Sequence, residues 1–124
     1  MTYILEHIGL GTSQEKYEPT VKFYETVFGW HRIRELDGEL TFLGDGQGGR
    51  FEIFPSSSTI RSNPTHMAFS VPAEDFDAVF KRIEEAGGKL DEPYMNEFDD
   101  RIGYFTDPAG NRAQIVTRSK ALEK

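Results

Sequence analysis

The sequence contains no cysteine, which excludes disulfide bonds, a thiolate nucleophile and a thiolate metal site. It has no run of about 18 apolar residues that would span a membrane, and its first residues, MTYILEHIGL, lack the features of an export signal. Positive charge is also scarce, since 14 Lys and Arg stand against 21 Asp and Glu, for a net charge of -7. We therefore expect a cytoplasmic protein that binds neither nucleic acid nor membranes.

The composition is that of a folded protein. The chain has 124 residues, of which 37% are hydrophobic and 13% aromatic, so it is long enough to bury a core as a single domain, residues 1–124. With cysteine absent, any bound metal must be held by His, carboxylate or amide groups.

An internal repeat organises the chain. HIGLGT at residues 7–12 and HMAFSV at residues 66–71 both place a His before small and apolar residues. Each copy is followed by apolar residues at helical spacing and then by a glycine that ends the helix, Gly29 in the first copy and Gly87 in the second. The helical stripes are Val21, Tyr24, Val27 and Phe28, and then Phe76, Val79, Phe80 and Ile83.

Three short strands are expected after each helix, which predicts an α+β fold of two tandem βαβββ modules. The first module spans residues 1–58 and the second residues 63–118, joined by a Ser-rich linker, PSSSTIRSNP, at residues 55–64. Neither half alone would bury its sheet well, so we also expect a homodimer. The predicted strands after the helices are 30–36, 39–43 and 50–54, and then 89–95, 101–106 and 112–117.

Four polar residues occupy matching positions in the two copies. Strand alternation places His7 and His66 on the face of each first strand that points away from the helix. On the closing strands, Glu52 and Gln114 stand between apolar neighbours and take the same face. A lone strand His is usually structural, but matched positions filled with ligand types favour a shared site.

Two segments, PTVKFYETVFGW in the first predicted helix and YFTDPAGNRAQIV near the carboxyl end, resemble the vicinal oxygen chelate superfamily, which includes glyoxalases, bleomycin-resistance proteins and dioxygenases. The similarity runs from about Ile4 to Arg118. It implies curved mixed sheets around a cleft that holds a divalent ion, such as Zn, Ni, Co, Mn or Fe(II). The ligands implied by position are His7, Glu52, His66 and Gln114.

The resemblance leaves three chemistries open. Members similar to lactoylglutathione lyase or methylmalonyl-CoA epimerase use four ligands, and a ligand carboxylate removes a proton next to a carbonyl, a role that would fall to Glu52. Ring-cleaving dioxygenases and fosfomycin-resistance transferases resemble a layout with two His and a closing-strand Glu, which Gln114 replaces. Drug-binding members of the bleomycin-resistance kind commonly lack the ligands. The first chemistry, a lyase or isomerase acting on a small carbonyl compound, fits the sequence best.

Candidate substrate-binding residues are three arginines and one phenylalanine. Arg50 and Arg112 lie two residues before Glu52 and Gln114, hence on the same face, where a guanidinium would hold a carboxylate or phosphate. Phe54 would line the cleft, and Arg101 is a further candidate. Solvation or salt bridges for the arginines and core packing for Phe54 are the alternative interpretations.

Overall fold

The computed structural model describes residues 2–59 and 65–124. It divides into two compact units, which we call the amino-terminal unit, His7–Thr65 with Leu122–Lys124, and the carboxy-terminal unit, Met1–Glu6 with His66–Ala121. The predicted linker, residues 55–64, is described only as far as residue 59, and its remainder lies outside the described residues. In the described part of the chain, no helix has the length and apolar character needed to cross a membrane.

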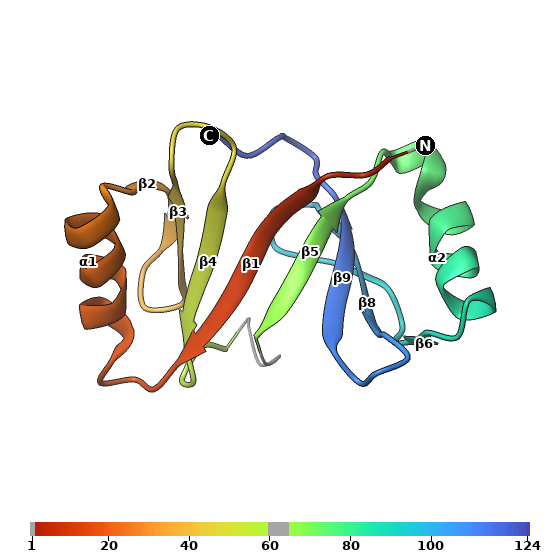
Figure 1. Cartoon of the computed structure of the whole chain (residues 1–124), viewed down its shortest axis with the longest axis horizontal. Helices are drawn as coiled ribbons and strands as arrows, with labels where there is room; N and C mark the ends of the chain where they lie inside the picture. Colours follow the sequence, from red (N-terminus) through yellow and green to blue (C-terminus); the bar gives the residue numbers. More distant parts are fainter. Residues whose placement is uncertain (1, 60–64) are drawn as a thin grey trace. The chain divides into compact units, whose positions relative to one another are not determined.

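The amino-terminal unit is a mixed sheet with one helix. Its strand order is β2-β3-β4-β1, in which β1 and β4 are parallel and the other neighbours are antiparallel. The helix α1 contacts β3 and β4, and Figure 1 shows it lying alongside these strands. The elements are β1 Leu5–Thr12, α1 Tyr17–Phe28, β2 His31–Leu36, β3 Leu40–Gly44 and β4 Arg50–Pro55.

The core of this unit lies between α1 and the sheet. Val21, Leu43 and Ile53 are fully buried there, and Leu10 packs against them from β1. The helix ends at Gly29, whose φ of 72° is left-handed and whose N–H donates to the carbonyl of Glu25. The predicted helix and its glycine stop are therefore confirmed, and the opposite face of the sheet is left for His7 and Glu52.

The carboxy-terminal unit repeats this plan. Its strand order is β5-β9-β8-β6, with β7 also paired to β8, and β5 and β9 are parallel as β1 and β4 are. The helix α2 contacts β6 and β9, and Figure 1 shows it alongside this sheet. The elements are β5 His66–Ser70, the 3₁₀ turn η1 Ala73–Asp75, α2 Phe76–Glu85, β6 Lys89–Leu90, β7 Tyr94–Met95, β8 Arg101–Thr106 and β9 Arg112–Thr117.

The core of this unit forms under α2, where Phe76 and Phe80 pack with Val71 and Ile115. The predicted α+β fold of two βαβββ-like modules is confirmed.

The predicted continuous strand at residues 89–95 is wrong. The structure forms two short strands instead, β6 and β7, which both pair with β8. Leu90 lies opposite Phe105 and Tyr94 opposite Ile102, so this segment carries one residue more than its partner between the two pairings. Pro93 lies in the gap, where its missing N–H prevents a continuous ladder.

Candidate metal centre

The two modules place their His residues in the same register. In the amino-terminal unit Gly9, two residues after His7, lies opposite Glu52 on β4. In the carboxy-terminal unit Ala68, two residues after His66, lies opposite Gln114 on β9. The sequence repeat is therefore a repeat of strand pairing, and each unit presents one His and one closing-strand polar residue on the same face of its sheet.

The pair in the amino-terminal unit consists of His7 and Glu52, which are 2% and 1% exposed. The distance from His7 Nε2 to Glu52 Oε1 is 3.9 Å, longer than a hydrogen bond. Two ligands that each lie about 2.1 Å from one ion are about 3–3.5 Å apart, so a small shift brings both atoms into coordination distance. The ring of Phe42 stands edge-on to His7, with centroids 5.1 Å apart, and limits its rotation.

The pair in the carboxy-terminal unit consists of His66 and Gln114, both buried. Gln114 Nε2 lies 3.1 Å from His66 Nε2, within hydrogen-bond distance, and the tautomer of His66 sets which group donates. The side-chain oxygen and nitrogen of an amide exchange places by a half-turn, which would present Oε1 to a metal ion instead. Without that rotation, Gln114 serves as a hydrogen-bond partner of a buried His66.

The donor set fits a divalent metal ion. His7, Glu52 and His66 are each buried, and imidazole and carboxylate are ligand types that divalent ions accept. A carboxylate removed from water needs a compensating positive charge, which a divalent ion supplies. The residue types thus support the metal expected from the sequence.

The predicted substrate residues of the amino-terminal unit contact the end of the chain. Arg50 Nε donates to the carbonyl of Glu123 at 2.7 Å, and Nη2 donates to the carbonyl of Leu122 at 3.1 Å. Phe54 is buried and packs with Leu122. Both side chains lie on the Glu52 face of β4, as alternation predicts.

The predicted arginines of the carboxy-terminal unit lie on opposite faces of its sheet. Arg112 stands over the ring of Tyr104, 4.9 Å from its centroid, and pairs with Asp91. Tyr104 lies opposite Gln114, so Arg112 belongs to the Gln114 face. Arg101 pairs with Asp77 of α2 at 2.9 Å and lies 4.0 Å above the ring of Phe76, on the helix face.

The sequence interpretation missed Tyr104. Its ring stands edge-on to His66 at 5.3 Å, and its hydroxyl lies 3.5 Å from His66 Nε2. It lies opposite Gln114 as Phe42 lies opposite Glu52, so the two residues are counterparts in the repeat. Alignment of the two copies from their closing strands backwards would have found this pair.

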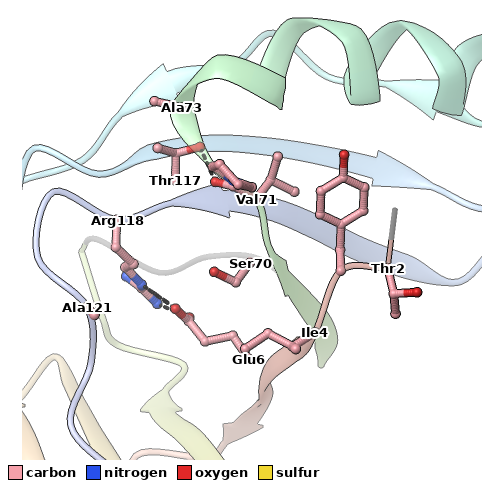
Figure 2. A pocket seen from close by; sticks show the side chains of 11 residues that line it. Thr2, Ile4, Glu6, Ser70, Val71, Ala73, Thr117, Arg118 and Ala121 are labelled. Carbon is pink, nitrogen blue, oxygen red and sulfur yellow. Dashed lines mark hydrogen bonds and ion pairs between the residues drawn. The ribbon is translucent and has the colours of Figure 1, made fainter.

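A separate cavity of about 420 Å³ lies in the carboxy-terminal unit, at the junction of the first residues, β5 and β9. Figure 2 shows Glu6 and Arg118 pointing toward each other in this pocket. Arg118 Nη2 donates to Glu6 at 2.6 Å, and Nη1 donates to Asp100 at 2.8 Å. Ser119 N also donates to Asp100. This buried cluster ties the end of β9 to β1 and to the turn before β8.

Comparison with known proteins agrees with this arrangement. Residues 4–115 match the Glyoxalase/Bleomycin resistance protein/Dioxygenase superfamily. A curated relative, "Metallothiol transferase FosB" from Lysinibacillus sphaericus, is 28% identical over 105 residues, which cover 81% of this chain and 73% of that protein.

Solved structures share the fold at low sequence identity. The Mn(II)-bound glyoxalase from Novosphingobium aromaticivorans has a TM-score of 0.71 at 20% identity, over 96% of this chain and 39% of that one. Methylmalonyl-CoA epimerase from Mycobacterium tuberculosis has a TM-score of 0.67 at 18% identity, over 94% and 88% of the two chains. The family match over residues 4–115 shows that the chain belongs to the glyoxalase/bleomycin resistance protein/dioxygenase superfamily.

Proposed function

We propose that the protein is a metal-dependent lyase or isomerase that acts on a small carbonyl compound. In this proposal His7, Glu52, His66 and Gln114 bind one divalent ion, and Glu52 removes a proton from the carbon next to the carbonyl. The observation that supports it is the shared strand register. In each unit, the residue two positions after the buried His lies opposite a ligand-type residue on the neighbouring parallel strand. Chance would seldom fill four matched buried positions with ligand types.

The chemistry of the four residues supports one base. Glu52 is the only carboxylate among them, and the amide of Gln114 cannot accept a proton. A bound divalent ion supplies positive charge that stabilises an enediolate. Proton removal and return on one side allows isomerisation or lyase chemistry, whereas racemisation would require a second base.

A binding protein without catalysis is the second candidate. The observation that favours it is the hydrogen bond between Gln114 and His66, which satisfies the buried imidazole with no metal. Dioxygenase or thiol-transferase chemistry, the latter suggested by the name of the Lysinibacillus relative, is less favoured because Gln114 stands where the sequence interpretation places the Glu of those enzymes.

Solvent deuterium exchange tests the proposed reaction. The purified protein is loaded with Zn, Ni, Co or Mn and incubated in deuterium oxide with 2-oxo acids or thioesters, and label is followed by NMR. We expect exchange at the carbon next to the carbonyl, and its loss in Glu52→Gln protein that still holds metal. Full exchange in the metal-loaded variant would eliminate Glu52 as the base, and no exchange with any metal would favour the binding protein.

A further inference from the structure

Residues 122–124 pack on the sheet face that carries His7 and Glu52. Leu122 is 8% exposed and packs with Leu40, Phe42 and Phe54. Phe42 is also the ring that stands edge-on to His7 and the residue opposite Glu52. An isobutyl side chain therefore occupies an apolar pocket one residue layer away from the proposed base.

The main chain of this segment is held by its oxygen atoms. Arg50 donates to the carbonyls of Leu122 and Glu123, and Gly46 N donates to the carbonyl of Lys124 at 2.8 Å. A Cβ at Gly44 would lie 2.3 Å from that Lys124 oxygen, so the segment lies against β3 at a distance that only glycine allows. The contacts define a small binding site: an apolar pocket for a branched alkyl group and, beside it, a guanidinium that binds oxygen.

We propose that residues 122–124 occupy a ligand subsite, and that its ligand is a branched aliphatic carboxylate of leucine size. The isobutyl group of the ligand takes the place of Leu122, and its carboxylate takes the place of the Leu122 carbonyl on Arg50. A carboxylate binds a guanidinium more strongly than a peptide carbonyl does, because the hydrogen bonds are charge-assisted and bidentate. The chain segment and the ligand then compete for one pocket.

This assignment, together with the proposed function on which this step rests, narrows the substrate to a branched 2-oxo acid such as 4-methyl-2-oxopentanoate. With the carboxylate on Arg50 and the isobutyl group in the Leu122 pocket, the 2-oxo group takes the place of the Leu122 Cα. Glu52 removes one proton from C3, the C3–H electron pair forms the C2–C3 double bond, and the carbonyl electrons move to oxygen. Return of a solvent proton to C3 restores the oxo acid with exchanged hydrogen, so this compound reports the proton-removal step and gives no new product.

Competition makes the subsite testable without metal or turnover. Leu122→Ser in the full chain removes the side chain that fills the pocket, and Gly44→Ala displaces the Lys124 carbonyl by steric overlap. With EDTA present, the dissociation constant of 4-methylpentanoate, which lacks the oxo group, is measured by calorimetry or NMR titration. We expect it to fall about tenfold or more in Leu122→Ser, since burial of a leucine side chain no longer opposes the ligand. We expect it to fall in Gly44→Ala as well, because the displaced segment competes less well for the pocket. Glu123→Ala is the matched control, because this variant keeps the main-chain oxygen of Glu123 that accepts from Arg50. We expect it to bind 4-methylpentanoate with the dissociation constant of the parent.

Selectivity and folding complete the test. Acetate, which lacks the isobutyl group, binds the Leu122→Ser protein at least tenfold more weakly than 4-methylpentanoate, and adding Arg50→Met abolishes the difference between parent and variant. Equal binding of the two acids, or an unchanged dissociation constant in both variants, overturns the proposal. So does unfolding of both variants, because the segment would then be an integral part of the core.

The outcomes for the subsite and for the reaction are separable. Binding of 4-methylpentanoate without deuterium exchange into 4-methyl-2-oxopentanoate by the metal-loaded protein keeps the subsite and rejects the base. Deuterium exchange into other carbonyl compounds, without binding of 4-methylpentanoate, keeps Glu52 as the base and rejects the subsite.

Discussion

Replacing Glu52 by Gln distinguishes a metal ligand from a structural ion pair. Glu52 Oε1 lies 3.9 Å from His7 Nε2, beyond hydrogen-bond distance, and keeping this carboxylate buried costs several kcal/mol. The substitution replaces it by a neutral amide of nearly the same shape, and an imidazole, unlike the guanidinium beside Glu6, need not keep a charge when its partner is lost. We therefore expect the free energy of unfolding of metal-free Glu52→Gln to lie within about 1 kcal/mol of the parent value.

Added metal should stabilise the parent more than the Glu52→Gln protein. At a free metal concentration of 100 times its dissociation constant, the parent gains about 2.7 kcal/mol, and a tenfold loss of affinity reduces that gain to about 1.4 kcal/mol or less in Glu52→Gln. The assay is urea unfolding with EDTA and with saturating metal. Glu6→Gln is the matched control, because Glu6 is an equally buried carboxylate that pairs with Arg118 at 2.6 Å, and its loss should cost about 3–5 kcal/mol with or without metal. A loss of 3 kcal/mol or more in metal-free Glu52→Gln would refute the reasoning and assign Glu52 a structural role.

Three further changes test the fold and the assembly. Asp100 is fully buried, and burial by itself would raise its pKa. Hydrogen bonds from Ser119 and Arg118 outweigh that effect and hold the pKa of Asp100 below its usual value. The stability that Asp100 contributes is therefore present above about pH 4 and is lost as the pH falls through the lowered pKa. Asp100→Asn should cost about 1.5–3 kcal/mol at pH 7, with a smaller decline in the unfolding free energy between pH 5 and 3 than the parent; equal declines would show that other groups control it. Gly103→Ala should lower the free energy of unfolding in urea by about 1–3 kcal/mol, because the added Cβ would lie 2.9 Å from Phe80 and 3.0 Å from Phe76. An unchanged unfolding midpoint would mean that α2 moves freely to make room for it. Phe23 and Val27 are exposed apolar residues on α1, and we propose that they join two chains, so Phe23→Glu should shift a sedimenting dimer to monomer; a dimer that persists excludes this face.

The duplicated pattern made most of the fold predictable. Helical spacing and the glycine stops located both helices, because an amphipathic stripe and a left-handed glycine are local signals. The break at Pro93 was also readable locally, but the apolar residues around it favoured a continuous strand. The DPAGN turn followed its sequence closely: Asp107 accepts from the main-chain N–H groups of Ala109 and Asn111, and Gly110 takes a positive φ.

The sequence predicted which face of each sheet the site residues occupy, but it did not predict which residues they contact. Alternation along the strands placed His7, Glu52, His66 and Gln114 away from the helices, which the core packing agrees with. The amide of Gln114, a polar group between Ala113 and Ile115, is explained by its contact with His66. The position of Leu122–Lys124 against Arg50 could not be predicted, because it joins residues more than 70 positions apart that no local pattern connects.

Metal content is the most direct test of the proposal that the repeated His positions bind a metal ion. The parent, His7→Ala and His66→Ala proteins are exposed to a divalent metal and gel-filtered, and bound metal per chain is measured, with circular dichroism to confirm folding. We expect one equivalent in the parent and loss of bound metal in both folded variants. A parent protein that retains no metal, or variants that retain a full equivalent, would contradict it.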